Sequence, residues 1–268
     1  MKGRTLLLGE PQPTAYDLNF NVLGFQVRIH PLFWLLALIF SSGGGRPDPS
    51  LILIGIPAIL VSILVHELGH ALAMRYYGQN ARIVLYAFGG LAIPETGGFN
   101  FASQRSRRPM EQIVISAAGP FAGFLLAVVT ACVVMAAGGK IVPIFEGLMP
   151  RVFADTSGTT LQQEQLNLLV QMLLFINIWW TILNLMPVYP LDGGQIAREV
   201  FVLIDSWRGI QNSLYLSLFI AGLLAFWGLS NGEMYLGLLF GSLAYSNWEV
   251  IQQISGRGGG FGGQRGPW

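Results

Sequence analysis

Charged residues are scarce in this chain of 268 residues. They make up 11% of it, whereas hydrophobic residues make up 53%. Ordinary soluble domains carry about 25% charged residues. This deficit runs along the whole chain, so it argues against an ordinary soluble domain and predicts a protein with several membrane-spanning helices. The net charge of +1 gives no electrostatic attraction to nucleic acid, and we expect no nucleic-acid partner.

Cysteine is almost absent, and we expect no cleavable signal peptide in the N-terminal residues. The single cysteine, Cys132, excludes an internal disulfide. It lies in an apolar run, where we expect a small core residue. Near the N-terminus the apolar run Leu6–Leu8 is too short for a cleavable signal peptide.

Long apolar stretches predict an all-α polytopic membrane protein with about six transmembrane helices. The first of these helices is short and would need flanking residues to complete a span. Between the second and third helices, two short strands, Ile83–Phe88 and Leu91–Ile93, are predicted around a Gly89-Gly90 turn. Because this hairpin is apolar, we expect it to associate with the membrane. The six expected helices are Pro31–Ser42, Leu51–Tyr77, Gln112–Ala137, Leu166–Met186, Leu214–Gly228 and Met234–Ile251.

Basic residues predict the orientation. With the N-terminus inside, only Arg46, Lys140 and Arg151 of the 15 lysines and arginines fall outside. This positive-inside bias predicts a multi-pass cell-membrane protein with both termini in the cytosol. We expect residues 1–29 to form a cytosolic N-terminal arm, residues 30–252 the transmembrane domain, and residues 253–268 a flexible glycine-rich tail.

The segment His66-Glu67-Leu68-Gly69-His70 lies inside the second expected helix. Two histidines and a glutamate are costly within a membrane, so they indicate a functional site. Residues i and i+4 share a helix face, so His66 and His70 can direct two imidazoles at one metal ion. Glu67 lies beside them and can act as the base for a metal-bound water. The pattern predicts a buried zinc site built for hydrolysis.

A catalytic zinc site needs a third protein ligand, with water in the fourth position. The remaining histidine, His30, lies at the expected membrane boundary, where an interfacial polar residue is the simpler interpretation. Asp192 is the strongest acidic candidate, because Pro187 and Pro190 end the fourth helix and the glycine pair after Asp192 allows close backbone approach. Taken alone, Asp192 would be interpreted as a helix cap or turn residue. The other acidic candidates on the same expected side are Glu95, Glu111, Glu199 and Asp205.

Three motifs together resemble the site-2 protease family of intramembrane zinc metalloproteases. They are HELGH in the second helix, AAGP at Ala117–Pro120 and NLMPVYPLDGG at Asn184–Gly194. Their order and spacing also match, over about residues 50–197. The resemblance implies that His66, His70 and Asp192 bind Zn²⁺.

The same resemblance implies that Glu67 is the catalytic base and gives Asn184 a role. In that family the asparagine at this position helps to bind the substrate or its oxyanion. From the sequence alone, an interhelical hydrogen bond of Asn184 is an equally good interpretation. Neither a PDZ nor a CBS domain is recognised, so the chain resembles a minimal catalytic core, with residues 30–252 as the metalloprotease domain.

These observations favour an enzyme that hydrolyses peptide bonds within or next to transmembrane segments, as in regulated intramembrane proteolysis. Its partners would be a transmembrane protein substrate and the lipid bilayer; the oligomeric state is not specified. The alternative is an intramembrane metal transporter or metal-binding membrane protein, because transporters also use clusters of histidines and acids. Against this alternative, the sequence offers neither a second ligand cluster along a path nor recognisable repeat halves.

Overall fold

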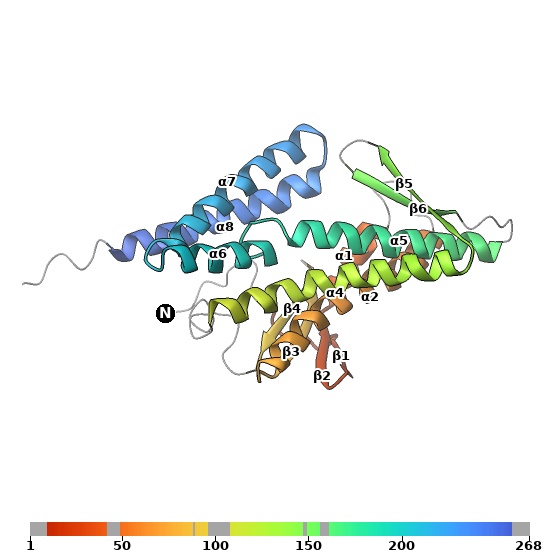
Figure 1. Cartoon of the computed structure of the whole chain (residues 1–268), viewed down its shortest axis with the longest axis horizontal. Coiled ribbons are helices and arrows are strands. Elements are labelled where there is room, and N and C mark those ends of the chain that lie inside the picture. Colours follow the sequence, from red (N-terminus) through yellow and green to blue (C-terminus); the bar gives the residue numbers. More distant parts are fainter. Residues whose placement is uncertain are drawn as a thin grey trace, which may run out of the picture. The chain divides into compact units, whose positions relative to one another are not determined.

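The computed structural model describes residues 10–41, 49–87, 89–95, 108–146, 149–155 and 161–258. The chain divides into two compact units. We call residues 8–106 and 117–183 the histidine unit, and residues 107–116 and 184–268, together with 1–7, the C-terminal unit. Figure 1 labels the helices and strands in chain order.

Within the described residues, four helices are long and apolar enough to span a membrane. They include α2, whose 28 residues reach about 42 Å at 1.5 Å per residue, against a hydrocarbon layer of about 30 Å. A mostly helical fold with several candidate membrane helices is therefore confirmed. The first expected span is a helix of only 11 residues, and the sixth is not among these four, so the count of six stays a prediction. The four helices are α2 (Pro49–Tyr76), α4 (Pro109–Ala136), α5 (Leu161–Asn184) and α7 (Gly209–Ser230); the others are α1 (Pro31–Ser41), α6 (Asp192–Ile204) and α8 (Met234–Gly258).

Large apolar side chains cover the outside of these helices. Leu53 on α2, Phe121 on α4 and Phe226 on α7 are 76%, 66% and 72% exposed. Such a surface is unfavourable in water and suits contact with lipid. Cys132 is also exposed on α4, so its expected place in the core was wrong: it lies on the outer face of the helix, whereas Ala127 and Val134 are buried.

A four-stranded sheet accompanies the helices of the histidine unit. Strands β1 (Leu18–Val22) and β2 (Phe25–Ile29) form a hairpin, β2 pairs in parallel with β3 (Ala81–Tyr86), and β3 pairs antiparallel with β4 (Gly89–Pro94). In β2 every second side chain is buried, as expected for a strand with one face against the core. Strands β1 and β2 lie inside the expected N-terminal arm and were not predicted.

The hairpin expected after α2 is present, with a different turn. Gly89 pairs with Tyr86 and Gly90 with Leu85, so both glycines belong to β4, and the connection precedes them. Phe88, expected at the end of the first strand, lies outside the described residues. A second hairpin, β5 (Lys140–Glu146) and β6 (Met149–Asp155), connects α4 to α5.

In the C-terminal unit, α7 packs against both α6 and α8, and α7 and α8 lie side by side (Figure 1). The backbones approach closely at Gly228, where an added Cβ would lie 2.8 Å from the amide nitrogen of Gly237. The expected end of the fourth helix before the prolines is confirmed at Asn184, after which α6 starts at Asp192. Helix α8 continues to Gly258, inside the expected tail, and residues 259–268 lie outside the described residues.

Candidate metal centre

His66 and His70 lie one turn apart on α2, and both are buried, at 2% and 7% exposure. Their Nε2 atoms are 3.2 Å apart and their rings are inclined by 77°. Two nitrogens that each bind a tetrahedral zinc ion at about 2.05 Å lie about 3.3 Å from one another. The separation in this chain fits that value, so the two imidazoles are placed to chelate one ion.

Glu67 is buried beside this pair, at 4% exposure, and packs against β4. A Cβ atom at Gly90 would overlap the Glu67 carboxyl group, so only glycine leaves room for it there. Tyr86, the partner of Gly89 in the hairpin, lies close enough for its ionisation to depend on Glu67. Burial, together with the negative charge of Glu67, raises the pKa of Tyr86 above its usual range, so its hydroxyl stays protonated.

Helix α4 packs against the histidines through glycine. A Cβ atom at Gly119 would overlap the ring of His70, and one at Gly123 would lie 3.9 Å from Nδ1 of His66. Conversely, a Cβ atom at Gly69 of α2 would overlap the carbonyl oxygen of Ala118 on α4. The sequence placed Gly119 within the AAGP motif but did not reveal that it faces His70.

Helix α5 is tied to α2 and α4 by two buried polar contacts. The Nδ2 atom of Asn177 donates hydrogen bonds of 2.8 Å to Oγ of Ser62 and to the carbonyl oxygen of Leu173. The hydroxyl of Thr181 donates to the carbonyl oxygen of Pro120 at 3.2 Å. These hydrogen bonds hold α5 against α2 and α4 beside the two histidines, and they give Asn177 a structural role.

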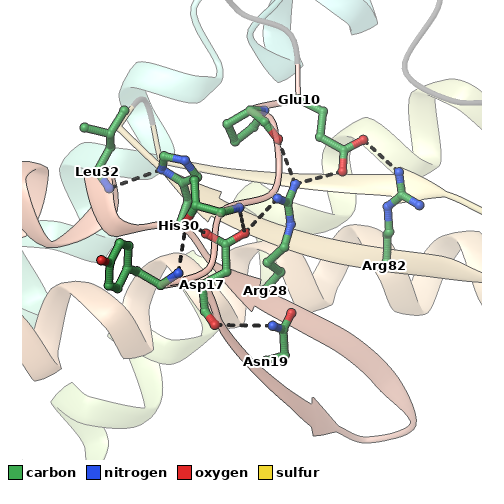
Figure 2. A network of polar contacts seen from close by, with 10 residues as sticks. Glu10, Asp17, Asn19, Arg28, His30, Leu32 and Arg82 are labelled. Carbon is green, nitrogen blue, oxygen red and sulfur yellow. Dashed lines mark hydrogen bonds and ion pairs between the residues drawn. The ribbon is translucent and has the colours of Figure 1, made fainter.

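His30 lies just before α1 and serves its N-terminus. Its Nδ1 atom accepts a hydrogen bond of 3.2 Å from the backbone N–H of Leu32 (Figure 2). This contact satisfies one of the free N–H groups of the first helical turn. The capping role agrees with the simpler interpretation of His30 as a polar residue at a boundary.

In the C-terminal unit, Asp192 is the first residue of α6 and is buried, at 7% exposure. The glycines that follow it allow a close fold-back of the chain: Cβ atoms at Gly193 and Gly194 would overlap the backbone of Leu185 and of Val188–Tyr189. The loop before Asp192 and the first turn of α6 therefore pack backbone against backbone.

Two later helices hold the same loop. The N–H of Tyr189 donates to Oγ of Ser217 on α7 at 3.0 Å, and its carbonyl oxygen accepts from Nδ2 of Asn247 on α8 at 2.7 Å. Ser217 and Asn247 are each 1% exposed. Asn184 is 9% exposed and ends α5, at the start of this loop.

Two of the other acidic candidates are engaged elsewhere in the C-terminal unit. The buried carboxylate of Glu199 accepts two hydrogen bonds from Arg198, at 3.0 and 2.5 Å. Oδ1 of Asp205 accepts the backbone N–H groups of Trp207 and Arg208 at the start of α7, and these bonds lower the pKa of Asp205. Asp192 therefore remains the best-suited buried carboxylate of this unit.

Comparison with known proteins finds a family model and several relatives that match the part of the chain carrying these residues. The family model described as Peptidase family M50 matches residues 54–225, a range that contains all five candidate site residues. Stage IV sporulation protein FB of Bacillus subtilis (strain 168) is 26% identical over 185 residues, which cover 66% of this chain and 48% of that protein. Zinc metalloprotease MJ0392 of Methanocaldococcus jannaschii is 23% identical over 186 residues, which cover 68% and 44%.

The chain thus spans about half the length of these two curated relatives. Among solved structures, the Site-2 Protease from Methanocaldococcus jannaschii matches with a TM-score of 0.54 and 20% sequence identity, over 88% of this chain and 95% of that one. This match shows a shared fold.

Proposed function

This chain belongs to peptidase family M50, the site-2 protease family, and we propose that it is an intramembrane zinc metalloprotease. Its substrates are membrane proteins, which it cuts within or next to a transmembrane segment. The observation that carries this proposal is the buried pair of imidazoles on α2, with Nε2 atoms 3.2 Å apart and a buried glutamate beside them. Three polar residues of this kind are too costly inside a membrane helix to serve packing alone.

His66, His70 and Asp192 hold the zinc ion in this proposal. When bound, zinc lowers the pKa of a water ligand to about 7 and polarises the scissile carbonyl. Asp192 supports the assignment because it is a buried carboxylate that follows a loop fixed at Tyr189 by hydrogen bonds to Ser217 of α7 and from Asn247 of α8. Two neutral imidazoles and one carboxylate are a known ligand set for catalytic zinc.

Glu67 acts as the general base. Its carboxylate takes a proton from the attacking water and delivers it to the leaving amine, a role worth about 10²–10⁴-fold in rate. Gly90 of β4 supports this assignment by leaving the space into which the carboxyl group projects. A base needs this fixed orientation, because the proton must pass over a hydrogen-bond distance.

Asn184 binds the substrate or the oxyanion that develops on its carbonyl, through the amide N–H₂ group. The competing assignment is an interhelical hydrogen bond. Substitution by aspartate separates the two, since aspartate keeps the shape and removes the donor. A role in the oxyanion site predicts a fall in kcat, and a structural role predicts a lower melting temperature.

The β3–β4 hairpin presents the substrate. A transmembrane helix hides its peptide bonds in its own hydrogen bonds, so cleavage requires local unwinding. Strand β4 is at the edge of the sheet, and an unwound segment can pair with it by strand addition. Because β4 also packs against Glu67, a strand added there would lie near the proposed base. The alternative is a hairpin that only plugs the site.

The protein is a multi-pass protein of the cell membrane with both termini in the cytosol. Four helices of spanning length and apolarity support the membrane assignment, and the distribution of lysine and arginine supports the orientation. An even number of spans keeps both ends on one side, and six is the number proposed.

The test is a cleavage assay with purified protein in detergent, supplied with zinc and a helical membrane substrate. Glu67→Gln should retain one zinc per chain and lose cleavage by about 10²–10⁴-fold. Zinc retained with cleavage intact would remove Glu67 from the mechanism. Zinc flux into vesicles that is unaffected by Glu67→Gln, without any cleavage, would favour the transporter.

A further inference from the structure

One face of the sheet, over β1, β2 and β3, is polar, and its Asn19, Asn21 and Gln26 are exposed. Asn19 and Asn21 on β1 stand opposite Arg28 and Gln26 on β2, and Gln26 stands opposite Arg82 on β3. An open pocket of about 680 Å³ lies over this face. Its lining combines these amide and guanidinium groups with residues 10–13, the start of the described chain.

Glu10 lines this pocket, and its carboxyl group faces Arg28 and Arg82 (Figure 2). Its carboxylate bridges two arginines, accepting from Nη2 of Arg28 at 2.9 Å and from Nη2 of Arg82 at 2.7 Å. The same Nη2 atom of Arg28 donates to the carbonyl oxygen of Pro11 at 3.0 Å. The sheet thus holds a carboxylate and the next main-chain carbonyl, which is how it would hold a bound peptide.

Asp17 fixes Arg28 in this arrangement. Its Oδ2 atom accepts from Nη1 of Arg28 at 3.0 Å, and its side chain is 3% exposed. Burial opposes its ionisation, but hydrogen bonds from Thr14 and Arg28 outweigh that effect and lower the pKa of Asp17. Without Glu10, the two arginines and this carboxylate leave one positive charge to be balanced.

Arg82 has bonding capacity left over. Its side chain is 41% exposed, while its Nε atom is buried and has no hydrogen-bond partner within the described ranges. A guanidinium group binds a carboxylate best through two parallel N–H groups, of which Glu10 uses one. The site therefore suits an acidic group, and Glu10 satisfies only part of its hydrogen-bonding capacity.

We propose that this polar face is a docking site for an extended acidic segment of a partner protein, with Glu10–Pro11 as its internal competitor. The partner's carboxylate would replace that of Glu10 between Arg28 and Arg82. Its main chain would continue along the amides of Asn21 and Gln26. Asn19 and Asn21 are about 7 Å apart along β1, the repeat of alternate residues in an extended peptide.

A peptide fits these groups better than an isolated phosphate. A phosphate would bind only the two arginines. It would not use the donor that Arg28 offers to a main-chain carbonyl, nor the amide side chains along the pocket. The proposal adds to the protease assignment without depending on it. The family match begins at residue 54, so Glu10 and Arg28 lie outside it, and binding is measured without cleavage.

The test uses a fluorescent peptide that copies residues 8–16, LGEPQPTAY, and the full chain in detergent. Fluorescence anisotropy should show saturable binding to Glu10→Gln that is tighter than to the wild type by about tenfold or more, the effect of one charge-assisted hydrogen bond. A peptide with glutamine in place of its glutamate should bind about tenfold more weakly.

Adding Arg82→Gln to Glu10→Gln should remove the gain, whereas the matched change Arg208→Gln, at an exposed arginine of the C-terminal unit, should preserve it. Arg82→Lys, which keeps the charge and loses the fork, should give intermediate binding, and thermal melting checks that each variant is folded. Equal binding by wild type and Glu10→Gln, or binding indifferent to Arg82, overturns the proposal. Competition by anionic phosphatidylglycerol vesicles as strong as by unlabelled peptide would assign the site to a lipid headgroup and overturn it as well.

Discussion

The histidine unit and the C-terminal unit hold their candidate ligands by different means. In the histidine unit, His66 and His70 owe their separation to the pitch of one helix, and glycines on neighbouring elements leave the space they need. In the C-terminal unit, Asp192 follows a loop that depends on Ser217 and Asn247, 28 and 58 residues away from Tyr189. A ligand pair on one helix can therefore be recognised from local sequence, whereas a ligand after a loop depends on long-range contacts.

The largest expected effect comes from the helix pair itself. His70→Ala removes one of two convergent nitrogens, so we expect loss of bound zinc and a loss of cleavage larger than the about 10²–10⁴-fold attributed to the base. His30→Ala is the matched control, because His30 caps α1 and should keep the zinc. Zinc content by mass spectrometry and the cleavage rate report both changes. Retention of one zinc per chain by His70→Ala would contradict the proposal that His66 and His70 bind the ion together.

The glycine clearance is the next contact to disturb. Gly119→Ala places a methyl group against the ring of His70, so we expect the pair to be displaced and zinc affinity to fall by about 10–100-fold, as when the support of a metal ligand is removed. Gly222→Ala, where an added Cβ meets nothing within 4 Å, is the matched control. Equal zinc affinity in the two variants would show that α4 can move to accommodate the added methyl group without displacing His70.

A smaller effect is expected from the loop support in the C-terminal unit. Asn247→Leu removes the donor to the carbonyl oxygen of Tyr189, and we expect zinc affinity and activity to fall by about tenfold, the lower end of the range for groups behind a metal ligand. Asn231→Leu changes an exposed asparagine that bonds only within its own helix end, and should leave both unchanged. If the two variants behave alike, the loop does not need α8.

The parts of this fold that were predictable are those encoded over short stretches. Apolar length predicted the four described helices that are long and apolar enough to span a membrane. The i, i+4 spacing predicted the histidine pair, and Pro187 and Pro190 predicted the end of α5. Strands β1 and β2 form a local hairpin around Leu23-Gly24, and this short signal was overlooked. The parallel pairing of β2 with β3 spans an interval that contains two helices, so it could not be derived from the sequence. The hairpin turn was misplaced because Gly89-Gly90 resembles a turn, whereas the Glu67 side chain requires a strand without a side chain at Gly90.

Two further partners could not have been derived from the sequence. Gly119 belongs to a recognisable motif, but the motif does not show that Gly119 faces His70. Nothing in the sequence around Tyr86 indicates that its phenol lies near Glu67. Both contacts join elements whose packing is decided by tertiary structure. The role of Asp192 as the third ligand remains a prediction from the motif around it.

X-ray absorption at the zinc edge tests that role most directly. Asp192→Cys, made in a Cys132→Ser background that removes the chain's single native thiol, offers zinc a sulfur in place of an oxygen. If His66, His70 and Asp192 share one ion, the spectrum should show one sulfur neighbour at about 2.3 Å together with two imidazoles. A first shell that keeps the imidazoles and contains no sulfur would mean that residue 192 does not bind the ion.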